Sequence, residues 1–168
     1  MTKTRNYSLI IILNVIVSIL FLLPLNKLDL LKENYSTLSL TTRGYLYVLI
    51  VGIIIGLLLA YETRKISNFI RAILMLVSML VGVIIPHHIP YNLQGNLHLV
   101  FAYIGFAGLV TITLLNCRIK KLRDMYLLPL FISVLIYLKY GMVNTLSEVI
   151  VMLSSLLINL LCNIKYKR

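Results

Sequence analysis

Acidic residues are scarce in this chain, and tryptophan is absent altogether. The 168 residues include five Asp and Glu against 16 Lys and Arg, which gives a formal net charge of +11. Only 12% of the residues are charged, whereas 60% are hydrophobic. Because soluble domains contain about a quarter charged residues, this chain lacks the polar side chains needed to cover a water-soluble fold. The composition therefore predicts an integral membrane protein.

Motifs that would carry catalysis or metal binding are also missing. The two cysteines, Cys117 and Cys162, stand far apart without a CxxC pair, which argues against a disulfide framework, a zinc ribbon or a thiol-redox enzyme. No GxSxG elbow, P-loop or GxGxxG is present. No nucleic-acid-binding motif accompanies the positive charge, so we expect no nucleic-acid partner. These absences favour a non-catalytic protein without a cofactor.

What the chain does contain is a series of six apolar segments, most of them long enough to cross a hydrocarbon core of about 30 Å. We expect one all-α domain over residues 1–168, an integral membrane bundle of six transmembrane helices. The basic residues before the first segment resemble a secretory signal, but no cleavage site follows, so we expect a retained span. In the fifth span Pro129 falls near the start, where proline costs a helix least. The spans cover approximately 8–23, 45–61, 69–85, 97–115, 126–140 and 146–162.

The distribution of basic residues predicts the orientation of this bundle. With six spans, twelve of the sixteen Lys and Arg fall on the side that holds both termini. Lys and Arg are enriched on the cytoplasmic side of membrane proteins. We therefore expect a multi-pass protein of the plasma (inner) membrane with both termini cytoplasmic, its basic edge contacting anionic lipid headgroups.

Small residues predict where helices pack closely, since close backbone approach drives helix association in lipid. Two glycines one turn apart in the second span and three small residues in the fourth span each share a helix face. We expect both faces to pack inside the bundle. The residues are Gly52 and Gly56, and Ala102, Gly105 and Gly108.

Polar residues gather at the predicted outer ends of spans three to six. His98 falls in the first turn of span four on the face of Ala102 and Gly105, so its ring should point inward. Glu148 is the one carboxylate within these six segments, and an intramembrane carboxylate usually has a partner. Lys139 and His98 are the partners we expect for it. The candidate cluster comprises His87, His88, His98, Lys139, Asn144 and Glu148.

Histidines and a carboxylate on one face can form a zinc site. His87, His98 and Glu148 are the candidate ligands, which leaves a metal-dependent membrane hydrolase as one alternative function. However, no HExxH occurs, and neighbouring histidines in one helix cannot readily reach one metal. The spacing favours hydrogen bonds that hold spans four, five and six together, with no bound metal.

The layout resembles the Frag/DRAM/Sfk-like membrane superfamily. The resemblance lies in six short spans with both ends inside and in a proline-bearing outer loop leading into H-x3-A-x3-F at His98, Ala102 and Phe106. Small bacterial members have no assigned function, whereas eukaryotic members include a factor for remodelling GPI-anchor lipids and modulators of autophagy. The resemblance implies a lipid-related function with His98 as the matched position. The first outer loop, 24–44, has no feature that matches the family pattern.

A second resemblance implies a different function. Six spans in fewer than 200 residues are also similar to the substrate-binding subunits of energy-coupling-factor importers, which work with a cytoplasmic ATPase. Against this alternative, the first span lacks the alanine-rich face with which such subunits dock on their partner. The outer loops also have no tryptophan to stack on a vitamin ring.

The predicted topology can be tested with accessibility tags. A tag inserted in the 87–98 hairpin should react with an impermeant reagent on intact cells, because this hairpin is predicted to lie outside. A tag at the carboxy terminus should react only after permeabilisation. Reaction of both tags in the same compartment would contradict six spans.

Overall fold

The computed structural model of the chain describes residues 2–63, 69–85 and 92–165, and within these ranges all regular structure is helical. The expected all-α fold is confirmed for this part of the protein. Six α-helices correspond to the six apolar segments, and two short 3-10 helices, η1 and η2, lie between the first two. The elements are α1 (Thr2–Leu22), η1 (Leu23–Lys27), η2 (Tyr35–Leu40), α2 (Thr42–Thr63), α3 (Phe69–Ile84), α4 (Leu93–Asn116), α5 (Lys120–Tyr140) and α6 (Thr145–Lys165).

The protein is a membrane protein, because four of its helical stretches are long and apolar enough to cross a bilayer. Their outward faces carry exposed leucine, isoleucine and valine, which in water would form an apolar patch far larger than monomeric soluble proteins expose. The four stretches are Ser8–Lys27, Thr42–Glu62, Leu93–Leu115 and Thr145–Lys165.

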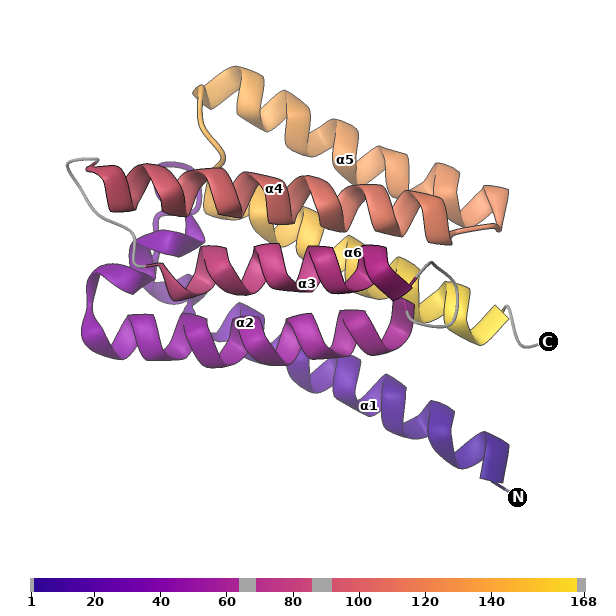
Figure 1. Cartoon of the computed structure of the whole chain (residues 1–168). Coiled ribbons are helices and arrows are strands. Elements are labelled where there is room, and N and C mark those ends of the chain that lie inside the picture. Colours follow the sequence, from indigo (N-terminus) through magenta and orange to yellow (C-terminus); the bar gives the residue numbers. More distant parts are fainter. Residues whose placement is uncertain (1, 64–68, 86–91, 166–168) are drawn as a thin grey trace.

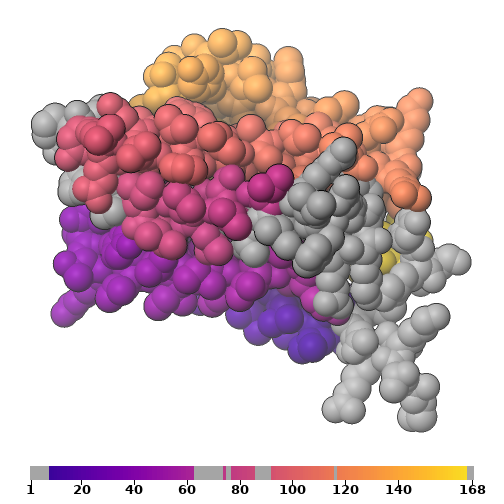
Figure 2. Space-filling view, viewed as in Figure 1, coloured from indigo at the N-terminus to yellow at the C-terminus, as the bar shows by residue number. Residues whose placement is uncertain are grey.

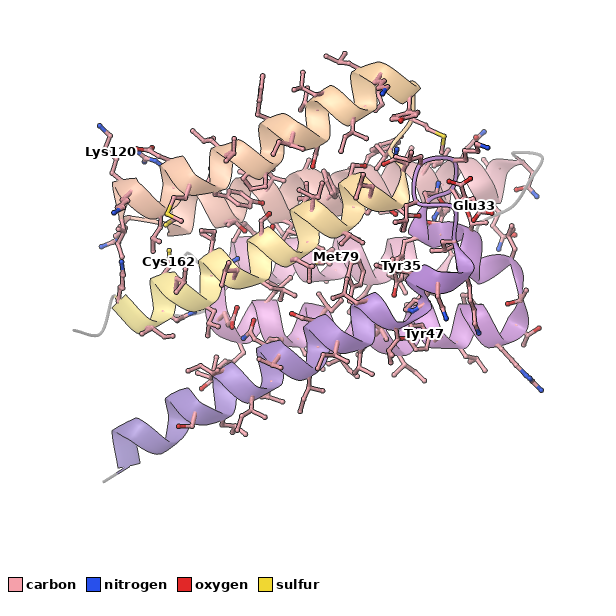
Figure 3. All side chains as sticks on the ribbon, turned by 180° about the vertical axis from the view of Figure 1, so that it is seen from behind. Glu33, Tyr35, Tyr47, Met79, Lys120 and Cys162 are labelled. Atoms are coloured by element: carbon pink, nitrogen blue, oxygen red, sulfur yellow. The ribbon has the colours of Figure 1, made fainter. Side chains whose placement is uncertain are left out.

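The helices run back and forth along the length of one bundle, so that both termini lie at the same end (Figure 1). We call this the termini end, and we call the opposite end, which holds residues 23–41 and 141–144, the loop end. α2, α3 and α4 lie side by side, with α6 behind them. Figure 3 shows Glu33 and Tyr35 at the loop end and Lys120 and Cys162 at the termini end.

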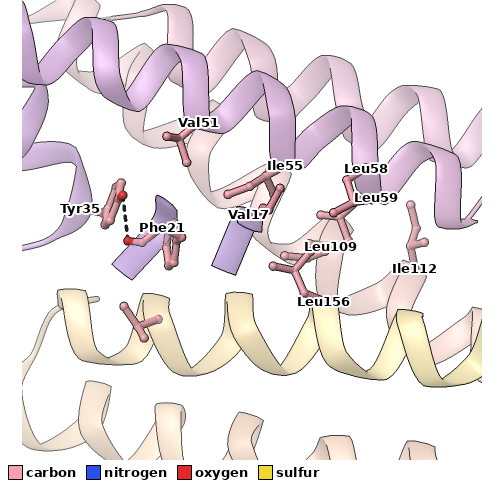
Figure 4. Close-up of a cluster of buried hydrophobic side chains, with 11 residues drawn as sticks. Val17, Phe21, Tyr35, Val51, Ile55, Leu58, Leu59, Leu109, Ile112 and Leu156 are labelled. Atoms are coloured by element: carbon pink, nitrogen blue, oxygen red, sulfur yellow. Dashed lines mark hydrogen bonds between the residues drawn. The ribbon is translucent and has the colours of Figure 1, made fainter. Parts of the chain in front are cut away.

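α6 is the central helix, since it packs against α1, α2, α4 and α5. The main apolar core lies where these helices meet, and Val17, Ile55, Leu109 and Leu156 are almost fully buried in it (Figure 4). The η2 segment contributes Tyr35 to the same core. The core therefore extends from the middle of the bundle to the loop end.

α5 packs mainly on α6 and forms the upper edge of the molecule in the space-filling view (Figure 2). Its outward side chains are strongly exposed, with Leu128 at 62% and Leu138 at 71%. The expected start of this helix was wrong: it begins at Lys120, so Pro129 lies inside it and not near its first turn. Lysine and arginine are good helix formers, and the helix therefore continues through the basic residues. Its other end is Gly141, whose φ of 71° lies in the left-handed region that favours glycine.

Glycines allow α2, α3 and α4 to approach each other closely. A Cβ at Gly105 would lie 3.1 Å from the Cα of Met79, and one at Gly52 would lie 3.0 Å from a Val83 methyl group. Gly82 of α3, which sequence reasoning passed over, meets the Ala102 backbone at 3.1 Å in the same way. The α3–α4 contact is therefore formed by small residues from both helices.

Replacing Gly105 with leucine should weaken this contact, because the added side chain would overlap the Met79 backbone. Overpacking of this kind costs about 1–3 kcal/mol. The matched control is A107L on the exposed side of the same helix, which should change the free energy of unfolding little. Thermal unfolding of both variants in detergent measures the difference, and equal stabilities would contradict the packing described.

Candidate functional site

A cavity of about 160 Å³ lies at the loop end, between the η2 segment and helices α2, α3, α4 and α6. Its walls are almost entirely apolar. Ile55 and Leu109 line the part of the cavity that lies toward the middle of the bundle. The cavity is partly open to its surroundings. The polar side chains that line it all lie near its loop end and come from three elements: Tyr35 and Ser36 of η2, His98 of α4 and Glu148 of α6.

The loop that covers this cavity is held by the first turn of α6. The Thr145 N–H donates to the Glu33 carbonyl oxygen at 2.7 Å, and the Leu146 N–H donates to the Leu30 carbonyl oxygen at 3.0 Å. The Asn144 side-chain amide donates to a third carbonyl oxygen of the loop at 3.2 Å. The first N–H groups of a helix have no partner within it, and here the loop supplies that partner.

Glu148 continues this attachment inside the cavity. Its carboxylate accepts a hydrogen bond from the Tyr35 N–H at 2.5 Å. The Tyr35 ring stacks on Phe21, with ring centroids 4.5 Å apart. Burial raises the pKa of Tyr35 well above its usual value, so the phenol stays protonated and donates to the Phe21 carbonyl oxygen at 3.1 Å.

His98 is connected to the same loop from the other side of the cavity. The side chain is only 5% exposed. Its Nδ1 lies 2.6 Å from the Ile85 carbonyl oxygen, and its Nε2 lies 3.0 Å from the Ser36 hydroxyl oxygen. Since Tyr35 binds Glu148 and Ser36 binds His98, two adjacent loop residues join the two helices.

The structure therefore brings part of the expected cluster together. His98 and Glu148 line one cavity, and the fully buried Asn144 caps α6 beside it through its hydrogen bonds to Ser147. Lys139 does not lie there: its ammonium group stands 5.3 Å from the Tyr140 ring centroid, and it forms no ion pair with Glu148.

The candidate metal ligands cannot all be placed. His87 and His88 lie outside the described residues. Within the described ranges, no three His, Cys, Asp or Glu side chains converge as a metal site would require. The remaining candidates, His98 and Glu148, have the hydrogen-bond partners given above.

A second buried polar cluster lies nearer the termini end and corrects one expectation. Glu148 is not the one carboxylate within the apolar stretches, because the stretch Thr42–Glu62 includes Glu62, which is 1% exposed. Its Oε1 accepts from the Asn14 amide at 2.6 Å, and the Asn163 amide donates to its backbone carbonyl oxygen at 3.1 Å. The Glu62 Oε2 and the Asn14 Oδ1 have no hydrogen-bond partner among the described residues.

The two cysteines also meet at this end. Cys117, which ends α4, and Cys162 of α6 are both buried free thiols with their sulfur atoms in contact. Their spacing in the sequence gave no indication of this pairing, because it depends on how α4 and α6 pack.

Sequence reasoning missed Tyr35 and Ser36, which line the cavity at its loop end. The signal for them was weak but present: the run Asn34-Tyr-Ser-Thr37 is polar in an otherwise apolar chain. Asn34 is also a favoured helix-capping residue, and its side chain accepts from the Thr37 N–H.

No family model matches the chain, and no curated protein or solved structure is similar to it.

Replacing Asn14 with leucine should destabilise the bundle, because Glu62 would lose its side-chain partner in an apolar surrounding. Leaving a buried polar group unpaired costs about 1–3 kcal/mol. The double variant N14L/E62L should be more stable than N14L, since it removes both polar groups. Unfolding of each variant in detergent measures these differences, with N26L at an exposed position as the control. A double variant less stable than N14L would show that Glu62 does not depend on Asn14.

Proposed function

We propose that the protein crosses the plasma membrane six times, with the loop end outside and both termini cytoplasmic. The alternating run of all six helices supports this topology, since α3 and α5 lie alongside the four long apolar stretches (Figure 1). The described basic residues at the start of α5 and the end of α6 lie at the termini end, where anionic headgroups would bind them. α3 spans 16 residues, and local thinning of the bilayer accommodates so short a helix at modest cost.

The function that the cavity favours is binding of a membrane lipid through one apolar chain. The observation that carries this proposal is the distribution of polarity: apolar walls run toward the middle of the bundle, and polar side chains lie only at the loop end. A lipid has the same polarity, with its ester and headgroup at the interface and its chains below. A lipid-related function is also what the resemblance to the Frag/DRAM/Sfk-like superfamily implies.

The size of the cavity favours a chain over a solute. An engineered apolar cavity of about 150 Å³ binds benzene, so the 160 Å³ found here has room for a short length of acyl chain. Sites for drug-sized ligands occupy about 300–1,000 Å³. The substrate-binding subunit of an importer would need a larger and more polar cavity.

The absence of tryptophan offers a direct test. The variant F106W places a single tryptophan on the cavity wall. We expect brominated phospholipid, titrated into detergent-solubilised protein, to quench its fluorescence with saturation near one lipid per protein. A bound chain would bring bromine against the indole at a fixed site.

The matched control is F131W on α5, where the native side chain is 60% exposed. Quenching of this variant should rise in proportion to the brominated fraction of the micelle, without saturation. Adding V48F, which fills part of the cavity, should remove the saturable quenching of F106W. Identical titration curves for F106W and F131W would contradict lipid binding in the cavity.

A further inference from the structure

The hydrogen bonds around His98 determine which ring nitrogen carries the proton. A carbonyl oxygen can only accept a hydrogen bond, so the contact of 2.6 Å with the Ile85 oxygen requires a proton on Nδ1. In the neutral imidazole, Nε2 is then an acceptor. Its partner at 3.0 Å is the Ser36 hydroxyl group, which must donate.

This arrangement has the parts of an activated nucleophile. A serine hydroxyl lies within hydrogen-bond reach of a general base, and a third group orients that base through its other nitrogen. The third group here is the Ile85 carbonyl oxygen. Both Ser36 and His98 also line the cavity, so the hydroxyl oxygen adjoins the space in which an acyl chain would lie.

We propose that Ser36 and His98 form an acyl-transfer site that hydrolyses a fatty-acyl ester at the outer membrane interface. The acyl chain would extend along the apolar walls toward Leu109, and its ester carbonyl would lie at the polar end of the cavity beside Ser36. The assignment of the acyl group rests on the proposed function. The assignment of the nucleophile and the base rests on the hydrogen bonds alone.

The reaction balances with water as its co-reactant. Ser36 Oγ attacks the ester carbonyl carbon while its proton moves to His98 Nε2. The bond from that carbon to the alcohol oxygen breaks, and the leaving alcohol takes the proton from Nε2. Water then attacks the acyl-serine, again giving a proton to Nε2, and the Ser36 oxygen recovers this proton as the fatty acid leaves.

One neighbouring residue supports this chemistry. The carboxylate of Glu148 holds the Tyr35 N–H at 2.5 Å and so fixes the residue next to the nucleophile. Its side chain also lines the same cavity. Glu148 is a positioning residue in this scheme, and Ser36 and His98 are the catalytic residues.

An alkyl fluorophosphonate tests the nucleophile directly, because it modifies activated serine hydroxyl groups and not ordinary ones. The full-length protein in detergent is treated with a short-chain probe and with a hexadecyl probe, and the modified residue is identified by peptide mass spectrometry. We expect both probes to label Ser36 and the hexadecyl probe to react faster. Mapping the site in the wild-type protein requires no variant to fold.

Variants then test whether His98 acts as a general base or has only a structural role. S36A should lose the label, and H98N should label at least about 100-fold more slowly, in line with the usual contribution of a general base. The control S154A removes a hydroxyl group whose hydrogen bond stays within α6, and its labelling rate should equal that of the wild type. Labelling of H98N at the wild-type rate would overturn the role of His98.

The outcomes distinguish the two proposals. If neither probe labels Ser36, the acyl-transfer site is wrong, and saturable quenching of F106W would still support lipid binding. If both probes label Ser36 at equal rates and quenching does not saturate, the nucleophile stands and the acyl-chain site is wrong.

Discussion

The start of α6 is the constraint on which the rest of this structure depends. The first N–H groups of a helix need acceptors, and inside an apolar bundle water does not supply them. Carbonyl oxygens of the loop between α1 and α2 do so instead, at Thr145 and Leu146. The loop is thereby fixed over the cavity, and Glu148, one turn further along α6, binds its Tyr35 N–H. The positions of Ser36 and of the polar end of the cavity follow from this attachment.

Several polar side chains elsewhere in the bundle are also paired, because an unpaired polar group in hydrocarbon costs several kcal/mol. Asn159 donates to the Thr113 hydroxyl oxygen at 3.0 Å, and the Tyr126 and Ser155 hydroxyl oxygens lie 2.6 Å apart. Most of these pairs join α6 to a neighbouring helix. Interhelical hydrogen bonds of this kind, more than apolar contact alone, specify which helices adjoin in lipid. They explain why α6 is central although it is the least apolar of the four long apolar stretches.

The sequence predicted six helices and the inward-facing residues of α4, because continuous apolar runs and small-residue spacing are local signals. It failed where structure depends on distant segments. The loop residues Tyr35 and Ser36 are positioned by hydrogen bonds to Glu148 of α6 and His98 of α4. No pattern in the sequence near residues 35 and 36 predicts these partners. Glu62 lies one residue beyond the predicted second span, which ends at residue 61, yet Asn14 of α1 pairs with it inside the bundle. The start of α5 was misplaced because charged residues were treated as helix boundaries.

The spacing of polar residues along α6 also determines the rotation of this helix about its axis. Ser155, Asn159 and Asn163 recur every four residues along one face, and Glu148 lies on the same face two turns before Ser155. Turning α6 by a single residue, about 100°, would separate all of them from their partners at once. The helix can therefore pack in only one rotational orientation. The direction in which Glu148 faces the cavity then depends on the amides of Asn159 and Asn163 near the opposite end of α6.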